Sequence, residues 1–150
     1  MSAARAHRGR GQPADFRIRV RIYWEDTDAA GIVFYANYLK FFERARTEWL
    51  RGFGLAQERL RAETGIGFVV SETALRYLAP ARLDDMIEVT VGVDRLGPAS
   101  LVVSQEAWRD GRLLAEGTIR VGCVDLGTFR PCRIPDDILA TLSRTERQQR

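Results

Sequence analysis

The sequence predicts an α+β fold in which one long helix is inserted after the first strand of an otherwise antiparallel sheet. Two patterns carry this prediction. Apolar residues recur at helical spacing from Tyr38 to Trp49, whereas the chain beyond residue 67 is a series of runs that alternate between apolar and polar residues. The length of 150 residues suits a single domain with its own core.

The first strand and the long helix show the clearest periodicity. Residues 16–22 alternate between apolar side chains and arginines, which predicts a half-buried strand with one wet face. The helix is expected to begin at Asn37, a favourable N-cap residue, and to end near Arg51, because Gly52 and Gly54 follow. At about 15 residues it spans about 22 Å, which is enough to cross several strands.

Turn residues and alternation predict the remaining elements. A short helix is expected over residues 55–63, and Asp110-Gly111 between two alternating runs predicts a tight hairpin. A terminal helical turn is expected over residues 136–142. With the first strand, the later strands give a sheet of about five strands. The later strands are expected over residues 68–78, 87–93, 101–107 and 113–124.

The chain is expected to divide into a basic tail, one domain and a polar end. The tail, residues 1–14, contains Arg5 and Arg10 and no acidic residue, a composition that favours disorder. The domain is expected over residues 15–143 and the polar C-terminal tail over residues 144–150.

Composition argues against several classes of protein. Hydrophobic residues make up 45% and charged residues 29%, and no run approaches the roughly 20 apolar residues of a membrane span. The net charge is +3, and because much of the excess lies in the tail, the nearly neutral domain is not expected to bind nucleic acid. Cys123 and Cys132 suit reduced thiols, so we expect a cytoplasmic protein.

Reactive groups are concentrated just before the long helix. Residues 24–28, Trp-Glu-Asp-Thr-Asp, place their carboxylates ahead of an Ala-Ala-Gly turn and an aromatic-rich helix start. The free N–H groups of a first helical turn can hold a developing oxyanion. A carboxylate beside them can attack a carbonyl carbon or activate a water molecule. This combination favours acyl transfer.

Residues 23–50 resemble the signature of hot-dog-fold acyl-CoA thioesterases, and Asp-Thr-Asp-Ala-x-Gly-x-Val, residues 26–33, is its most specific part. The resemblance is to the Tol–Pal-associated acyl-CoA thioesterases and the Pseudomonas-type 4-hydroxybenzoyl-CoA thioesterases. It extends over residues 16–124. It implies an antiparallel sheet wrapped around one long central helix.

The resemblance also implies roles for individual residues. Asp28 occupies the position of the catalytic aspartate, and Gly31 is the glycine ahead of the helix. The backbone N–H of Tyr35 falls where the family polarises the thioester carbonyl. Tyrosine at this position is typical of the hydroxybenzoyl group, whereas the Tol–Pal group usually carries histidine. Asp28 would either attack to form an anhydride or act as the base for water.

Both candidate carboxylates have a structural alternative. Asp28 could instead shape the loop through an Asx turn. Glu43 is the second candidate, because some hot-dog thioesterases work from a helix glutamate, but a surface pair with Arg46 or Thr47 is the simpler interpretation. His7 is the only histidine, so Ser-His-Asp and Cys-His triads are not expected. No metal and no cofactor is expected.

Substrate contacts are expected in two places. Arg95 and Ser100 lie in a turn that suits the phosphates of coenzyme A, because a guanidinium binds phosphate through paired hydrogen bonds. An ordinary surface arginine is the alternative. Around the motif, the other candidate substrate-binding residues are Gly31, Val33, Phe34 and Tyr38.

The sequence therefore predicts a thioesterase that hydrolyses a fatty or aromatic acyl-CoA to the free acid and CoA. Acyl-carrier protein is an alternative source of the thioester, and a non-catalytic protein that binds acyl-CoA or a partner is a third interpretation. One helix cannot cover the sheet and both of its edges, so we expect a homodimer or homotetramer. We also expect each active site at a subunit interface, where the Asp28 loop faces the Arg95 turn of a neighbouring subunit.

Overall fold

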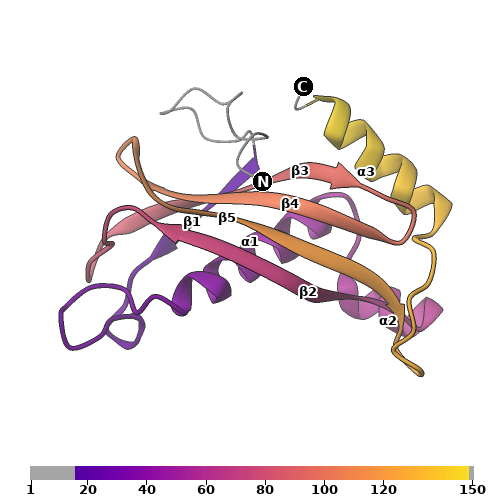
Figure 1. The fold of residues 1–150 in the computed structure, drawn as a ribbon, viewed down its shortest axis with the longest axis horizontal. Helices are drawn as coiled ribbons and strands as arrows, with labels where there is room; N and C mark the ends of the chain where they lie inside the picture. The colour runs from indigo at the N-terminus through magenta and orange to yellow at the C-terminus, as the bar shows by residue number, and fades with distance from the viewer. Residues whose placement is uncertain (1–15, 149–150) are drawn as a thin grey trace.

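A computed structural model describes residues 16–148, so the predicted basic tail lies outside the described residues. Strand β1 (Phe16–Arg21) leads through a 3-10 turn, η2 (Trp24–Asp26), to the long helix α1 (Asn37–Gly52) (Figure 1). The later elements are α2 (Gln57–Thr64), β2 (Ile66–Tyr77), β3 (Met86–Leu96), β4 (Ser100–Arg109), β5 (Arg112–Asp125) and α3 (Asp136–Gln148).

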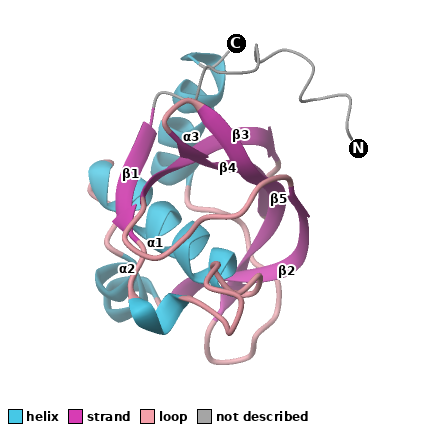
Figure 2. Ribbon diagram, turned by 90° about the vertical axis from the view of Figure 1, so that its left-hand side faces the viewer, coloured by secondary structure: helices cyan, strands magenta, loops and turns pink. Residues whose placement is uncertain are grey.

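The five strands form one antiparallel sheet in the order β1-β3-β4-β5-β2. Figure 2 shows this sheet curving around α1, which runs along its concave side. Strands β3, β4 and β5 follow one another as neighbours, whereas β1 and β2 form the two outer edges. The predicted α+β arrangement of sheet and central helix is confirmed.

Helix α1 packs against the sheet through one apolar stripe. Its buried residues recur at helical spacing, and they face a strand, β3, whose alternate residues are also buried. The buried helix residues are Tyr38, Phe41, Phe42, Ala45, Trp49 and Leu50, and the buried apolar residues of β3 are Ile87, Val89, Val91 and Val93.

A buried polar side chain joins α1 to the middle of the sheet. Gln105 is fully buried, and its Nε2 donates to the carbonyl oxygens of Phe42 at 3.0 Å and Thr90 at 3.2 Å. Its Oε1 accepts a hydrogen bond from Nη1 of Arg46 at 2.9 Å. Because each polar atom of the amide has a partner, its burial carries no unmet desolvation cost.

The turn between β4 and β5 agrees with the sequence prediction, whereas the C-terminal helix is longer than predicted. Asp110 and Gly111 have φ of 50° and 78°, the left-handed pair that a two-residue hairpin requires, as predicted. Helix α3 runs to Gln148, well beyond the single turn expected at residues 136–142. Ile138 and Leu142 lie one turn apart in the core and anchor it, so the polar residues that follow continue an established helix.

The sheet edges differ in a way that bears on assembly. Strand β1 has only 6 residues, and every second one is an arginine. Charged residues on a short edge strand disfavour pairing with a further strand. Strand β2 has 12 residues, and five consecutive positions, 70–74, are exposed. No helix in the described chain is both long and apolar enough to cross a membrane.

Candidate active site

Asp28 opens a tight turn closed by hydrogen bonds. Its carbonyl oxygen accepts the N–H of Gly31, its own N–H donates to the carbonyl of Ile32, and its Oδ1 accepts the N–H of Ala30, each at 2.9 Å. Gly31 has φ of 79°, a left-handed conformation that only glycine adopts freely. The Asx turn considered for Asp28 is therefore present, but it occupies only one carboxylate oxygen.

The second carboxylate oxygen of Asp28 faces outward. The side chain is exposed, and Oδ2 has no hydrogen-bond partner among the residues that the structure describes. A single carboxylate can accept hydrogen bonds on both oxygens, so the Asx turn leaves Oδ2 able to act on a bound molecule. The structural and the catalytic interpretations of Asp28 are thus compatible.

The backbone N–H of Tyr35, on the same loop as Asp28, is a free hydrogen-bond donor among the residues described. Within the same peptide group, the carbonyl oxygen of Phe34 accepts the N–H of Asn37 at 2.8 Å. The next carbonyl, that of Tyr35, accepts the hydroxyl of Tyr77 at 3.1 Å. No acceptor for the Tyr35 N–H is found in the described part of the chain. A hydrogen bond at the carbonyl polarises its peptide group, so this N–H is a strengthened donor.

Asn37 has a different role from the predicted N-cap. The N-cap position is Ala36, which offers no side-chain hydrogen bond, and Asn37 is the first helical residue. Its Nδ2 donates to the carbonyl of Asp26 at 2.8 Å, and the N–H of Phe34 donates to the same oxygen at 2.9 Å. The side chain therefore fastens the loop to the helix start instead of capping the helix.

Aromatic rings surround this segment. The ring centroids of Phe34 and Tyr35 are 4.8 Å apart, and Tyr77 lies 6.1 Å from Tyr35 and 5.6 Å from Tyr38. Phe34 and Tyr35 are exposed, 42% and 62%, whereas Tyr38 and Val33 are buried in the core. Among the substrate-binding residues predicted from the sequence, Phe34 therefore has its side chain at the surface, whereas the side chains of Val33 and Tyr38 are buried.

Tyr77 was missed by the sequence analysis. It ends β2, 42 residues after Tyr35, and no local pattern links the two positions. Burial raises the pKa of Tyr77, so its hydroxyl stays protonated and donates to the Tyr35 carbonyl. The only signal in the sequence is a tyrosine at the last position of an alternating run.

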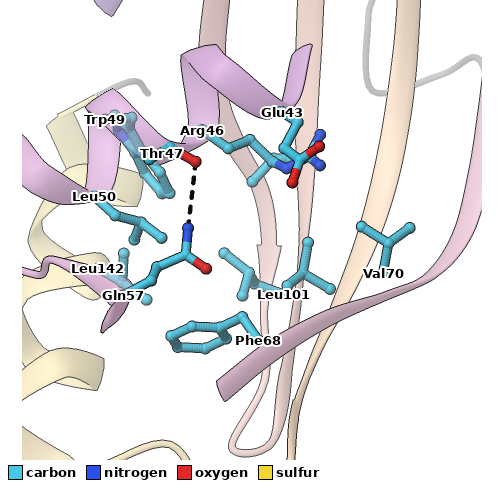
Figure 3. Close-up of a pocket in the computed structure, with 12 residues that line it drawn as sticks. Glu43, Arg46, Thr47, Trp49, Leu50, Gln57, Phe68, Val70, Leu101 and Leu142 are labelled. Atoms are coloured by element: carbon cyan, nitrogen blue, oxygen red, sulfur yellow. Dashed lines mark hydrogen bonds between the residues drawn. The ribbon is translucent and has the colours of Figure 1, made fainter. Parts of the chain in front are cut away.

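Glu43 lines a cavity between α1 and the β2 edge of the sheet, and Asp28 is not among the residues that line it (Figure 3). The cavity has a volume of about 160 Å³, and Phe68 and Val70 of β2 line it opposite the helix. Burial lowers the pKa of Arg46, and the nearby charge of Glu43 acts in the opposite direction. No direct ion pair joins Glu43 and Arg46 in the described residues, so the charge of Glu43 acts on Arg46 through space.

Arg95 and Ser100 lie at the end of the sheet opposite Asp28. Arg21, shortly before the Asp28 loop, pairs with Met86 at the start of β3, whereas Arg95 is close to the end of the same strand. About nine residue steps along a strand span about 30 Å. Within one chain the structure therefore keeps Arg95 and Asp28 apart.

Comparison with known proteins assigns the chain to a family. A family model described as "Thioesterase-like superfamily" matches residues 22–142, which include the Asp28 turn, Tyr35 and Tyr77. The chain belongs to the thioesterase-like superfamily. The family and the fold class implied by the sequence resemblance are both confirmed.

Relatives of this superfamily member carry names that describe an activity. It is 42% identical over 125 residues to the acyl-CoA thioesterase YbgC of Haemophilus influenzae, covering 83% of this chain and 92% of that protein. It is 44% identical over 126 residues to the acyl-CoA thioester hydrolase YbgC of Escherichia coli O6:H1, covering 83% of this chain and 93% of that protein.

Solved structures agree with the fold. A hypothetical protein from Thermus thermophilus has 34% identity and a TM-score of 0.82, covering 87% of this chain and 99% of that chain. A probable thioesterase from Bartonella henselae has 28% identity and a TM-score of 0.76, covering 79% of this chain and 98% of that chain. Both likenesses span nearly the whole of the other chain, so the match is to a complete domain.

Proposed function

We propose that this thioesterase-superfamily protein hydrolyses acyl-CoA thioesters, with Asp28 as the reacting carboxylate and the Tyr35 N–H as the donor to the oxyanion. One observation carries the proposal: an exposed carboxylate oxygen and a backbone N–H that has no acceptor among the described residues occur on one loop, immediately before a long helix. The names of the two YbgC relatives support the substrate class.

The chemistry follows from these two groups. As the thioester carbonyl carbon becomes tetrahedral, negative charge collects on its oxygen, where the Tyr35 N–H and the positive end of α1 stabilise it. Oδ2 of Asp28 either attacks that carbon, giving an anhydride that water then cleaves, or takes a proton from an attacking water. In both routes the C–S bond breaks, CoA leaves as a thiolate, and a water oxygen ends in the free acid.

We also propose that the protein is a homodimer joined through β2. This edge is long and exposed, whereas the β1 edge is short and basic. If β2 paired antiparallel with the same strand of a second copy, the interface would be self-complementary, as two-fold symmetry requires. The Ile66 end of β2 would then lie beside the Tyr77 end of the partner strand, next to the Asp28 loop.

Such a dimer would bring a cavity and the Arg95 turn toward Asp28, which a single chain does not do. The cavity and the Arg95 turn both lie toward the Ile66 end of the sheet, since Phe68 pairs with Cys123, whose N–H donates to the carbonyl of Ala99. The pairing would therefore bring the partner's Arg95 toward this Asp28 loop. The cavity would be in position to receive the acyl group, with Glu43 of the partner subunit as a second carboxylate.

The thiols support a reducing compartment for this enzyme. Cys123 and Cys132 are both free although their sulfur atoms are 3.5 Å apart. We propose that the protein acts in the cytoplasm, where such a pair stays reduced.

A thioester panel tests the proposed activity. Each acyl group, fatty and aromatic, is presented both as its CoA thioester and on acyl-carrier protein, and free thiol release is followed. We expect turnover of the CoA forms well above the uncatalysed rate. Turnover of the carrier-protein forms alone would show that the substrate is acyl-carrier protein and not acyl-CoA. Binding of acyl-CoA without turnover would contradict the enzymatic proposal.

Replacing Arg95 by alanine should weaken the use of CoA thioesters. A charge-assisted contact to phosphate is worth about 1.5–3 kcal/mol, so we expect KM for CoA substrates to rise about 10-fold or more. Pantetheine thioesters lack the nucleotide phosphates, so their KM should change little. Arg144→Ala on α3 removes the same charge elsewhere and is the control. Equal effects on both substrates would place the phosphate contact elsewhere, with Arg76 and Arg82 next to test.

A further inference from the structure

Arg109, the last residue of β4, binds both ends of residues 80–85, a segment that pairs with the Asp28 loop. Its Nη1 donates to Oδ2 of Asp85 at 2.6 Å and to the carbonyl oxygen of Pro80 at 3.0 Å. The two side chains are only 22% and 24% exposed, whereas those of the pairs Arg17–Glu88 and Arg59–Glu63 are between 38% and 74% exposed. The link is therefore partly shielded from water, and salt screens it less than an exposed pair.

Asp85 fixes the other end of the same segment, residues 80–85. Its Oδ2 accepts the N–H of Arg82 at 2.8 Å, and its own N–H donates to the carbonyl of Arg82 at 3.1 Å. Burial acts to raise the pKa of Asp85, but the Arg82 N–H and the Arg109 guanidinium hold it below its usual value. The carboxylate therefore remains charged at neutral pH and keeps both hydrogen bonds.

The segment 80–85 pairs through its backbone with the loop that carries Asp28. The N–H of Val33 donates to the carbonyl of Ala81 at 2.9 Å, and Ile32 pairs with Arg82 as an isolated bridge. Ile32 also accepts the N–H of Asp28, which closes the Asp28 turn. Hydrogen bonds joined by short stretches of backbone thus run from Arg109 through this segment to the turn that holds Asp28.

We infer that Arg109, through Asp85, is a positioning residue for the Asp28–Tyr35 loop and that it sets kcat rather than substrate affinity. Neither side chain belongs to the candidate reacting groups, so the effect is exerted through the backbone of residues 80–82. A displacement of about 1 Å at a reacting group can cost about 100-fold in rate, so the loop needs such support. The inference rests on the proposed function for its kinetic part only.

Arg109→Gln tests the inference, with Arg17→Gln as the matched control. Arg17 pairs with Glu88 at 2.9 Å and also joins neighbouring strands, but it contacts neither the loop nor segment 80–85. We expect Arg109→Gln to lower kcat at least about 10-fold while KM for an acyl-CoA changes less than about twofold. Arg109→Lys keeps the charge and should recover part of kcat. Arg17→Gln should stay near wild type.

Amide hydrogen exchange supplies a readout that does not depend on activity. In Arg109→Gln, the N–H groups of Asp28 and Val33 should exchange faster, whereas that of Cys123, bonded at the far end of the sheet, should not. If Arg109→Gln does not fold, Asp85→Asn is measured instead, because its amide oxygen can still accept the Arg82 N–H.

The outcomes separate this inference from the proposed function. Unchanged exchange at Asp28 and Val33 would overturn the positioning role, and so would equal losses of kcat in Arg109→Gln and Arg17→Gln. If the wild-type protein hydrolyses no thioester but the two amides still exchange faster in the variant, the loop support stands and the assigned reaction fails.

Discussion

Replacing Asp28 by asparagine is expected to lower kcat for acyl-CoA hydrolysis by at least about 100-fold, because the amide can neither attack the carbonyl carbon nor accept a proton from water. The substitution should leave the fold intact. Asparagine keeps an Oδ1 that accepts the Ala30 N–H, so the Asx turn survives. KM should change little, since the side chain is not required to hold the substrate. Steady-state kinetics and circular dichroism on the purified variant measure both effects.

The control for this experiment is a neighbouring carboxylate. Glu25 is exposed and lies in η2, outside the turn, so Glu25→Gln should retain wild-type kcat. Hydrolysis by Asp28→Asn within a few-fold of wild type would remove Asp28 from the reaction. Glu43→Gln would then be the next variant to assay.

Mixed dimers are expected to recover activity that neither parent has. In a dimer whose site combines Asp28 of one subunit with Arg95 of the other, an Asp28→Asn chain paired with an Arg95→Ala chain carries one doubly damaged site and one intact site. Random exchange makes about half of the dimers mixed, so the mixture should reach about a quarter of wild-type activity at low CoA substrate. If the Asp28→Asn dimer keeps about 1% of wild-type activity and the Arg95→Ala dimer about 10%, the average of the two parents is only about 5% of wild type.

Subunit exchange must be shown independently, by mass spectrometry of differently tagged chains. Activity that equals the average of the parents, with exchange proven, would place Asp28 and Arg95 of one chain in the same site or remove Arg95 from the site. A monomer by light scattering at micromolar concentration would contradict the β2 dimer itself.

Features set by local periodicity could be predicted from the sequence. The buried stripe of α1 follows the spacing of Tyr38, Phe42, Ala45 and Trp49, and the β4–β5 hairpin follows from Asp110-Gly111. The Asp28 turn is similarly local, because Gly31 supplies its left-handed residue. In each case the determining residues are close together in the chain.

Features that depend on contacts between distant residues could not. The hydroxyl of Tyr77 reaches the Tyr35 carbonyl across 42 residues, and Arg109 reaches Asp85 across 24. Asn37 looked like an N-cap because its side chain is suited to one, but the carbonyl of Asp26 lies within reach and takes its hydrogen bond. The partners of Tyr77 and Arg109 become neighbours only when β2 and β4 are placed in the sheet, and Asn37 reaches Asp26 only once the loop between them has folded back.

The most direct test of the account is a structure of the protein with a non-hydrolysable acyl-CoA analogue in which a methylene separates sulfur from the carbonyl. We predict that the carbonyl oxygen accepts a hydrogen bond from the Tyr35 N–H, within about 3 Å, and that Oδ2 of Asp28 faces the carbonyl carbon directly or through one water. A carbonyl bound beside Glu43 of the same chain, with the Tyr35 N–H unoccupied, would contradict the account.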